Sequence, residues 1–322
     1  MAIDGKRKLA IILGGKSAER DVSIMTGMAV YEVLERTGLF FIKKFDPKLD
    51  PLQKLIDFDP FVVFNALHGR YGEDGYMQGF LEVLGIPYTG AGVLGCALSM
   101  NKWTTKKILM AYGYPVPKAL YITKNTNFDL TKAIKEHGIG FPAIVKPNDE
   151  GSSVRVSLVS SNVELLKGVE NVFTYGKDAL IEEFIEGKEV QVAILGNRNL
   201  GSVEIIPDNA FYDYEAKYMP GKSKHLIPPR IDRGILEVIE DLAKKTHRAL
   251  DLYPLSRIDF KIHPENGPFI LEANALPGLT KTSLVPEIAR HAGISFEKLS
   301  VLLIEYALNK VGKTLDYGIA TY

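Results

Sequence analysis

Two acidic residues and one amide stand in two neighbouring apolar segments, where they could together bind a divalent cation. Asp259 lies in the first segment, and Glu272 and Asn274 lie in the second. The connection between the segments, residues 264–267, contains the Asn-Gly pair typical of a tight turn, so we expect a β-hairpin. Carboxylate and amide oxygens suit Mg²⁺, and phosphate oxygens often complete its coordination shell.

The register of this hairpin decides which side chains meet. A turn that pairs His263 with Pro268 places Asp259 opposite Glu272. A tighter turn changes the partners but keeps the same residues on each face, because side chains alternate along a strand. The expected polar face holds Arg257, Asp259, Glu272 and Asn274. The expected apolar face holds Ile258, Phe260, Ile262, Leu271 and Ala273.

The polar face has two interpretations, which the hairpin alone does not separate. Facing carboxylates repel each other, so a cation between them is expected, and a metal ion would serve. Alternatively, the face is solvated and Arg257 and Lys261 neutralise it. Beyond the hairpin, Gly278 precedes a helix beginning at Ser283, whose free backbone N–H groups could hold a carboxylate or a phosphate.

Residues 146–153 form a candidate phosphate-binding loop between two expected strands. Gly151 and the two serines after it allow backbone N–H groups and hydroxyls to approach phosphate oxygens, while Lys146 supplies a positive charge. An ordinary loop would explain the same residues. Acidic residues near the end of the apolar segment 179–185 could hydrogen-bond adenine and ribose, and a surface edge strand is the alternative.

Two glycine patterns resemble nucleotide-binding motifs without meeting their requirements. Gly15-Lys16-Ser17 follows an expected strand, but the first glycine of a P-loop would fall at Ala10, inside that strand. Gly90, Gly92 and Gly95 have the spacing of a dinucleotide motif, but no acidic residue follows about 20 residues later. We therefore expect a tight strand-to-helix turn at these glycines.

The elements that must position these residues follow from the apolar periodicity. In the first third, strands are expected over 9–13, 40–45, 61–67 and 86–89, and helices over 19–36 and 76–84. This alternation predicts a parallel sheet. From about residue 101 the pattern is α+β. Strands are expected there over 118–123, 142–146, 154–159, 179–185, 189–195, 200–206, 256–263 and 269–274. The corresponding helices are 102–111, 235–250, 283–291 and 295–311, and a long loop spans 208–229.

Composition limits the possible partners. The 322-residue chain has 39 basic and 39 acidic residues, so its overall charge favours neither nucleic acid nor an anionic membrane. The single cysteine, Cys96, cannot form an internal disulfide, and its apolar surroundings favour a buried thiol. No apolar run approaches the roughly 18 residues of a membrane span, and no signal-peptide pattern is present. We expect a cytoplasmic protein.

Together these residues resemble the D-alanine–D-alanine ligases, members of the ATP-grasp superfamily. The resemblance covers nearly the whole chain and rests on several blocks in the right order. The blocks are residues 13–23, 68–75, 150–153, 212–218, 257–260, 272–274 and 277–278. It implies an α/β protein of three lobes, with a parallel-sheet domain over 1–100 and ATP held between α+β lobes over 101–187 and 188–322.

The resemblance also implies a role for each matching residue. The nucleotide positions are Lys102, Lys146, Ser153, Glu182, Glu183, Phe184, Ile185, Glu189 and Lys217. The magnesium ligands are Asp259, Glu272 and Asn274. The substrate-binding positions are Glu19, His68, Arg257, Gly278, Ser283 and Leu284. The catalytic positions are Glu19, Ser152, Tyr218, Arg257 and Gly278.

The implied reaction joins two D-alanine molecules at the expense of ATP, through an acyl phosphate, for peptidoglycan precursor synthesis. It would use two Mg²⁺ ions, which Mn²⁺ can replace, in a homodimer. A ligase for D-serine or D-lactate and a catalytically idle nucleotide-binding relative are the alternatives. The chain departs from the family pattern at Asn101, Arg155, Leu158 and Ala275. Asn101 and Ala275 lie next to functional positions without replacing them, and Arg155 could alter the mobility of the Gly151 loop.

Overall fold

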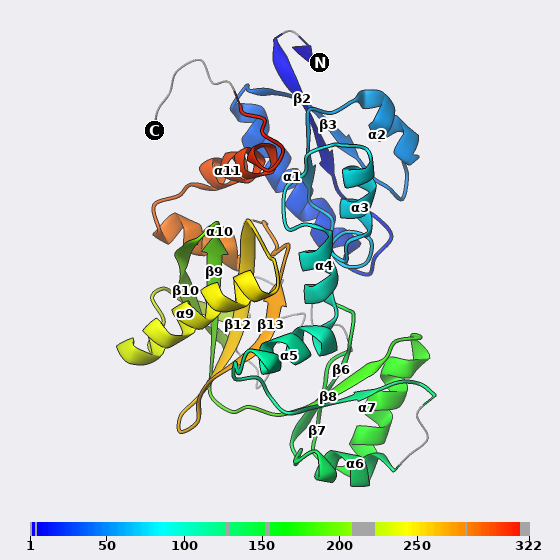
Figure 1. The fold of residues 1–322 in the computed structure, drawn as a ribbon, viewed down its shortest axis with the longest axis vertical. Coiled ribbons are helices and arrows are strands. Elements are labelled where there is room, and N and C mark those ends of the chain that lie inside the picture. Colours follow the sequence, from blue (N-terminus) through cyan, green and yellow to red (C-terminus); the bar gives the residue numbers. More distant parts are fainter. Residues whose placement is uncertain are drawn as a thin grey trace. The chain divides into compact units, whose positions relative to one another are not determined.

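The computed structural model describes residues 2–3, 5–125, 129–151, 155–207, 223–280 and 282–315 (Figure 1). The chain divides into two compact units. The first contains residues 1–96, 252–255 and 275–322, and the second contains residues 97–251 and 256–274. The division into three lobes stays a prediction.

The first unit is built on a small, mostly parallel sheet. Its strands are β1 (Ala2–Ile3), β2 (Lys6–Ile12), β3 (Phe40–Phe45) and β4 (Val62–Asn65). Strand β2 lies between β3 and β4 and runs parallel to both, while β1 adds an antiparallel edge. The apolar run from Leu9 to Ile12 is fully buried, as expected for a strand covered on both faces.

Six helices begin in the first unit among the described residues. They are α1 (Arg20–Arg36), α2 (Leu52–Phe58), α3 (Tyr76–Val83), α4 (Val93–Met100), α10 (Leu284–His291) and α11 (Phe296–Asn309). Helix α11 packs against α1 and β4, so the last part of the chain completes this core. The short helix α2 was not expected. The expected strand 86–89 is reduced to one parallel bridge between Val63 and Tyr88.

The glycines after that bridge form a turn into α4, as expected. Gly90 has a φ of +96°, which favours glycine, and a Cβ atom there would lie 2.2 Å from Leu276 Cδ2. Helix α4 begins three residues later, at Val93. Glycine at position 90 therefore allows the turn from this bridge into α4.

The second unit contains two antiparallel sheets. The first has the order β5-β8-β6-β7, and α7 packs on it. Its strands are β5 (Ala119–Ile122), β6 (Ala143–Pro147), β7 (Ser157–Val159) and β8 (Ala179–Glu183). The accompanying helices are α5 (Lys102–Ala111), α6 (Leu130–Glu136) and α7 (Asn162–Thr174). Because β8 lies between two strands, the surface-edge interpretation of segment 179–185 is wrong.

The other sheet has the order β11-β10-β9-β12-β13, and α9 (Arg233–Ala249) crosses one of its faces (Figure 1). Its strands are β9 (Lys188–Leu195), β10 (Arg198–Pro207), β11 (Ser223–Leu226), β12 (Leu255–His263) and β13 (Gly267–Asn274). The expected loop 208–229 is wrong over 223–226, since β11 pairs there with β10. Residues 208–222 lie outside the described part.

The hairpin register confirms the expected pairing at the polar face, although the expected turn is wrong. Asp259 pairs with Glu272, and Arg257 pairs with Asn274. However, His263 pairs with Gly267, one residue earlier than expected. A β-bulge after Asp259 absorbs the difference. Near the turn it exchanges the faces of β13, so that Ile270 is buried and the expected core residue Leu271 is only half-buried.

A buried histidine joins α9 to the apolar side of β12. His247 Nδ1 lies 2.7 Å from Ser256 Oγ, and both residues are buried. Burial, together with the charge of Arg248, lowers the pKa of His247 to about 4. Since Ser256 and Arg257 point to opposite faces, α9 covers the side of β12 away from the polar set.

We expect the His247 pair to make the protein sensitive to mild acid. The folded-state pKa of about 4 lies below the ordinary value of 6.5. Between these values the unfolded chain binds the additional proton, so stability falls as the pH falls through this window, by about 2 kcal/mol at pH 5. Thermal melts at pH 7 and pH 5 should show the native chain losing a few degrees more than His247→Gln. Equal losses in both proteins would contradict this expectation.

No helix in the described ranges is both long enough and apolar enough to cross a membrane.

Candidate functional site

The predicted site residues fall into two groups, one in each unit, and each group is described by itself. The first unit carries Glu19, His68, Gly278, Ser283 and Leu284. The second unit carries Lys102, Lys146, Glu182, Glu183, Phe184, Ile185, Glu189, Arg257, Asp259, Glu272 and Asn274. Four further predicted residues lie outside the described part of the chain: Ser152, Ser153, Lys217 and Tyr218.

The polar face of the hairpin is organised around Asp259. Arg257 Nε and Nη2 donate to the two oxygens of this carboxylate at 2.8 and 2.9 Å. Asn274 Nδ2 donates to Asp259 Oδ2 at 3.3 Å. Asp259 is 5% exposed and the Glu272 side chain is 31% exposed, so the face is only partly solvated, and Arg257 neutralises Asp259 as the solvated-face interpretation expected.

The second acid of this face belongs to a line of four alternating charges. Lys146 Nζ lies 3.8 Å from Glu272 Oε1 and 2.9 Å from Glu182 Oε2. Lys106 Nζ lies 3.1 Å from the other oxygen of Glu182. Strands β6, β8 and β13 and helix α5 each supply one member. Two cations and two anions thus balance in a largely buried place.

The charges in this line fix one another's protonation. Burial raises the pKa of Glu182, but the ammonium groups of Lys106 and Lys146 outweigh burial and hold the pKa below its usual value. Burial lowers the pKa of Lys146, but Glu182 and Glu272 outweigh it and the pKa is raised. Lys146 and Glu182 are therefore charged at neutral pH. Burial lowers the pKa of Lys106, and the Glu182 carboxylate beside it opposes that shift.

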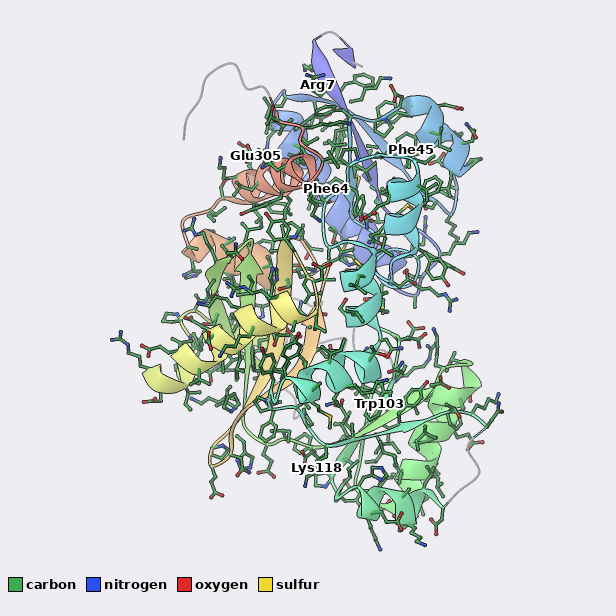
Figure 2. All side chains as sticks on the ribbon, in the orientation of Figure 1. Arg7, Phe45, Phe64, Trp103, Lys118 and Glu305 are labelled. Carbon is green, nitrogen blue, oxygen red and sulfur yellow. The ribbon has the colours of Figure 1, made fainter. Side chains whose placement is uncertain are left out.

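Helix α5 begins against the candidate phosphate loop. The backbone N–H of Lys102 donates to Asn148 O at 3.0 Å, and that of Trp103 (Figure 2) donates to Asn148 Oδ1 at 2.8 Å. Lys102 Nζ also donates to the carbonyl of Glu150. Asn101 caps the helix by accepting from the backbone N–H of Thr104. The departure at Asn101 therefore keeps an effective cap.

The far end of the same loop explains the departure at Arg155. This residue has a φ of +59°, in the left-handed region that favours glycine. Its guanidinium stacks over the ring of Tyr175. Cation–π contact offsets part of the backbone strain, so the arginine occupies a position where the family usually has glycine.

The end of β8 leads into β9 through a tight connection. Glu183 Oε1 accepts from the backbone N–H of Lys118 (Figure 2) at 2.7 Å. Phe184 is half-buried and Ile185 is buried. A Cβ atom on Gly187 would lie 2.0 Å from Ile262 O, so only glycine lets the two backbones approach.

Glu189 lies at the start of β9, beyond this connection. Its carboxylate lies 3.4 Å from Lys261 Nζ. Lys261 therefore neutralises Glu189, not the acidic pair of the hairpin to which the solvated-face interpretation assigned it.

In the first unit, Glu19 and His68 lie close together. Glu19 precedes α1 and is buried, and its Oε2 atom would lie 2.8 Å from a Cβ on Gly69. His68 is also buried, and its Nε2 lies 3.0 Å from Thr26 Oγ1. A carboxylate beside a fixed imidazole can receive an ammonium group.

Gly278 and Ser283 form a second neighbouring pair of the first unit. A Cβ on Gly278 would lie 3.0 Å from Ser283 Oγ. The Ser283 hydroxyl accepts from the backbone N–H of Thr280 at 3.0 Å and does not cap α10. Leu284, the first residue of α10, is buried.

Sequence reasoning missed Lys106. This lysine is 3% exposed, and its Nζ also donates to Pro117 O at 2.9 Å. The sequence feature that could have indicated its burial is its position in α5. Lys106 follows the nucleotide position Lys102 by four residues, and it lies beside Thr105 and Leu109, which are on the buried side of the helix.

Two family models match the chain. The one described as D-ala D-ala ligase C-terminus matches residues 108–305, and the one described as D-ala D-ala ligase N-terminus matches residues 43–91. The chain belongs to the D-alanine–D-alanine ligase family. The family resemblance drawn from the sequence is confirmed.

Relatives in this family align along nearly the whole chain. A D-alanine–D-alanine ligase of Desulforamulus reducens is 43% identical and covers 94% of this chain and 99% of its own length. The D-alanine–D-alanine ligase of Geotalea uraniireducens is 41% identical and covers 95% of this chain and 97% of its own length. The ligase of Bacillus anthracis, solved in complex with ATP, is 31% identical with a TM-score of 0.82 and covers 94% of this chain and 98% of its own. The expected α/β architecture is confirmed.

Proposed function

We propose that this chain joins two D-alanine molecules into D-alanyl-D-alanine while ATP is converted to ADP and phosphate. The arrangement of Arg257, Asp259, Glu272 and Asn274 on one strand face carries the proposal, because such a face can bind a metal–phosphate group and stabilise growing negative charge. Membership of the ligase family, and the ATP complex of the relative from Bacillus anthracis, support it.

The reaction would proceed in two displacements. A carboxylate oxygen of the first D-alanine attacks the γ-phosphorus, which forms an acyl phosphate and breaks the bond to the β-phosphate oxygen, releasing ADP. The amino group of the second D-alanine then attacks the acyl carbon and expels phosphate, and the amine loses its proton. No side chain need serve as nucleophile, so catalysis depends on positioning and charge stabilisation.

We assign the residues of the second unit to the nucleotide and the transition state. Lys102 and Lys146 would neutralise phosphate oxygens, and Glu182 and Glu189 would bind adenine and ribose. The backbone near Glu183, Phe184 and Ile185 would line the base. Arg257 would stabilise the tetrahedral oxyanion, since its guanidinium is already fixed by Asp259.

The residues of the first unit would bind the amino acids. Glu19 would receive the first D-alanine's ammonium, with His68 beside it. Ser283 and the start of α10, including Leu284, would hold the second carboxylate, and the Gly278 N–H would donate to the oxyanion. Four residues outside the described part would also take part by the family pattern: Ser152 and Tyr218 as catalytic residues, and Ser153 and Lys217 at the phosphates.

Two Mg²⁺ ions would bind at Asp259, Glu272 and Asn274. Among the described residues, no group of three or more His, Cys, Asp or Glu side chains could hold a metal. The hairpin nevertheless fits Mg²⁺, because two opposed carboxylates and an amide offer hard oxygen ligands and ATP phosphates supply the rest. When bound, the ions would screen the charge of the phosphates.

An activity assay tests the proposed reaction. ADP formation is measured with D-alanine, with L-alanine, and with D-alanine plus D-serine or D-lactate, and products are identified by mass spectrometry. We expect the dipeptide from D-alanine alone. If D-alanine is joined to D-serine or D-lactate in preference to a second D-alanine, the acceptor differs from the proposed one. If no amino acid increases ADP formation, the chain is a catalytically idle relative.

The metal assignment predicts the result of changing Glu272. For Glu272→Gln we expect the Mg²⁺ concentration giving half-maximal activity to rise roughly 10-fold or more, because one charged ligand is lost. Calorimetric titration of ATP at several Mg²⁺ concentrations should show the same shift. Glu265→Gln, an exposed acid at the hairpin turn, is the matched control. An unchanged Mg²⁺ requirement in Glu272→Gln would remove this residue from the metal site.

The family pattern also implies a homodimer that works in the cytoplasm. Light scattering coupled to size-exclusion chromatography tests the dimer, and a monomeric mass at working concentration would contradict it.

A further inference from the structure

We propose that Lys106 is a positioning residue, which fixes the Glu182 carboxylate for the nucleotide base and leaves Lys146 available to the phosphates. The inference rests on the proposed ATP-dependent function and goes beyond it, because Lys106 matches none of the positions assigned above.

The geometry around Lys106 fixes its ammonium group on two sides. Nζ donates to Pro117 O at 2.9 Å and lies 3.1 Å from Glu182 Oε1. The side chain is 4% exposed, as is that of Glu182. An ammonium held by a backbone carbonyl in a closed environment has little freedom, so it defines where the Glu182 carboxylate lies.

The geometry also leaves one acceptor position open on Glu182. Glu182 Oε1 lies 3.1 Å from Lys106 Nζ and Oε2 lies 2.9 Å from Lys146 Nζ, so Oε2 can accept from a ligand once Lys146 turns to a phosphate. A carboxylate oxygen can accept more than one donor. The exocyclic amino group of adenine is such a donor, whereas guanine presents a carbonyl oxygen at the corresponding place and would be repelled.

The charge balance explains why one lysine is not enough. Lys146 contacts both Glu182 and Glu272. If Lys146 turns to a phosphate oxygen, Glu182 would be left as an uncompensated buried anion unless a second cation stays with it. Lys106 is that cation, because its ammonium group is also fixed by the hydrogen bond to Pro117 O. With Lys106 present, Lys146 can exchange partners at small cost.

A purely structural role is the competing explanation. In that case, loss of Lys106 would lower the melting temperature, but the folded protein would bind ATP normally. The two explanations therefore differ in nucleotide affinity and nucleotide choice, both measured on folded protein.

The test compares Lys106→Met with the native chain well below the melting temperature of each. We expect the Kd and KM for ATP to rise about 10-fold, since a hydrogen bond to a charged group is misplaced. We also expect the preference for ATP over GTP to shrink, while the KM for D-alanine and kcat stay within about threefold. Lys107→Met is the matched control, because Lys107 is the next residue of α5 and is exposed.

A double-mutant cycle shows whether Lys106 acts through Glu182. In a Glu182→Gln background, Lys106→Met should change the Kd for ATP by less than about twofold, because the partner charge is already gone. If Lys106→Met alone does not fold, the double variant can still be compared with Glu182→Gln. Removing both charges leaves no Glu182 carboxylate without its Lys106 partner.

Three results would overturn the inference. They are an ATP affinity of folded Lys106→Met equal to that of the native chain, an unchanged preference for ATP over GTP, or an equal effect of Lys106→Met in both backgrounds. Failure of the proposed function would look different, because the native chain would then bind ATP without forming ADP in response to D-alanine, or would not bind ATP.

Discussion

Arg257→Ala is expected to lower kcat by a factor on the order of 10² to 10³, the usual result of removing one donor from an oxyanion site. The native guanidinium is held by two hydrogen bonds to Asp259. It is therefore oriented before substrate arrives and needs no reorganisation when negative charge develops on the reacting oxygen.

The shape of the side chain, and not only its charge, underlies this expectation. The planar guanidinium can contact Asp259 through one edge and still offer N–H donors elsewhere. Lysine has a single ammonium, so Arg257→Lys should recover only part of the lost kcat. Steady-state kinetics of the three proteins measure this order.

Folding must be separated from catalysis in that experiment. Asp259 keeps the hydrogen bond from Asn274 in the variant but loses its cationic partner, so we expect a normal circular dichroism spectrum at the assay temperature and a lower melting temperature. Arg233→Ala is the matched control, because this arginine is exposed at the start of α9. If Arg257→Ala keeps most of its turnover, Arg257 has no part in the mechanism.

Glu182→Ala is expected to destabilise the second unit by about 3–5 kcal/mol, the range found when one member of a buried ion pair is removed. The substitution leaves the ammonium groups of Lys106 and Lys146 without the anion that both contact. Chemical denaturation measures the effect. Glu136→Ala changes an exposed acid of the same unit and should cost less than about 1 kcal/mol.

The pH dependence provides a second measurement on the same residue. The folded-state pKa of Glu182 is held below its usual value of 4.5. Its contribution is therefore complete above pH 4.5 and is lost as the pH falls below that value toward the folded-state pKa. The native chain should lose more stability than Glu182→Ala over this acidic range. Equal losses, or a stability of Glu182→Ala close to that of the native chain, would show that the lysines are compensated elsewhere.

The sequence predicted the polar face of the hairpin, because which residues share that face depends only on whether they are an even number of positions apart. Asp259, Glu272 and Asn274 share a face in both registers that were considered, and the observed pairing agrees. The turn itself was not predicted, because no local residue signals the β-bulge after Asp259 that shifts the register.

The features that the sequence did not predict are those that depend on contacts with distant parts of the chain. Strand β11, Ser-Lys-His-Leu, lacks β-branched residues and forms because the edge of β10 offers hydrogen-bond partners. Lys106 has the residue type of a surface position. Its burial depends on Glu182, which is 76 residues away in the sequence, so only the fold reveals the pair.

The two hairpin carboxylates have counterions from the same chain: Arg257 contacts Asp259, and Lys146 approaches Glu272. Each hairpin carboxylate already has a cationic neighbour from the same chain. A divalent ion bound at this face would therefore share Asp259 with Arg257 and would replace Lys146 beside Glu272, which would free that ammonium group for the anionic groups that accompany the ion. Because each acid has an internal counterion, the two carboxylates repel each other less, and an ion without phosphates would gain little by binding there.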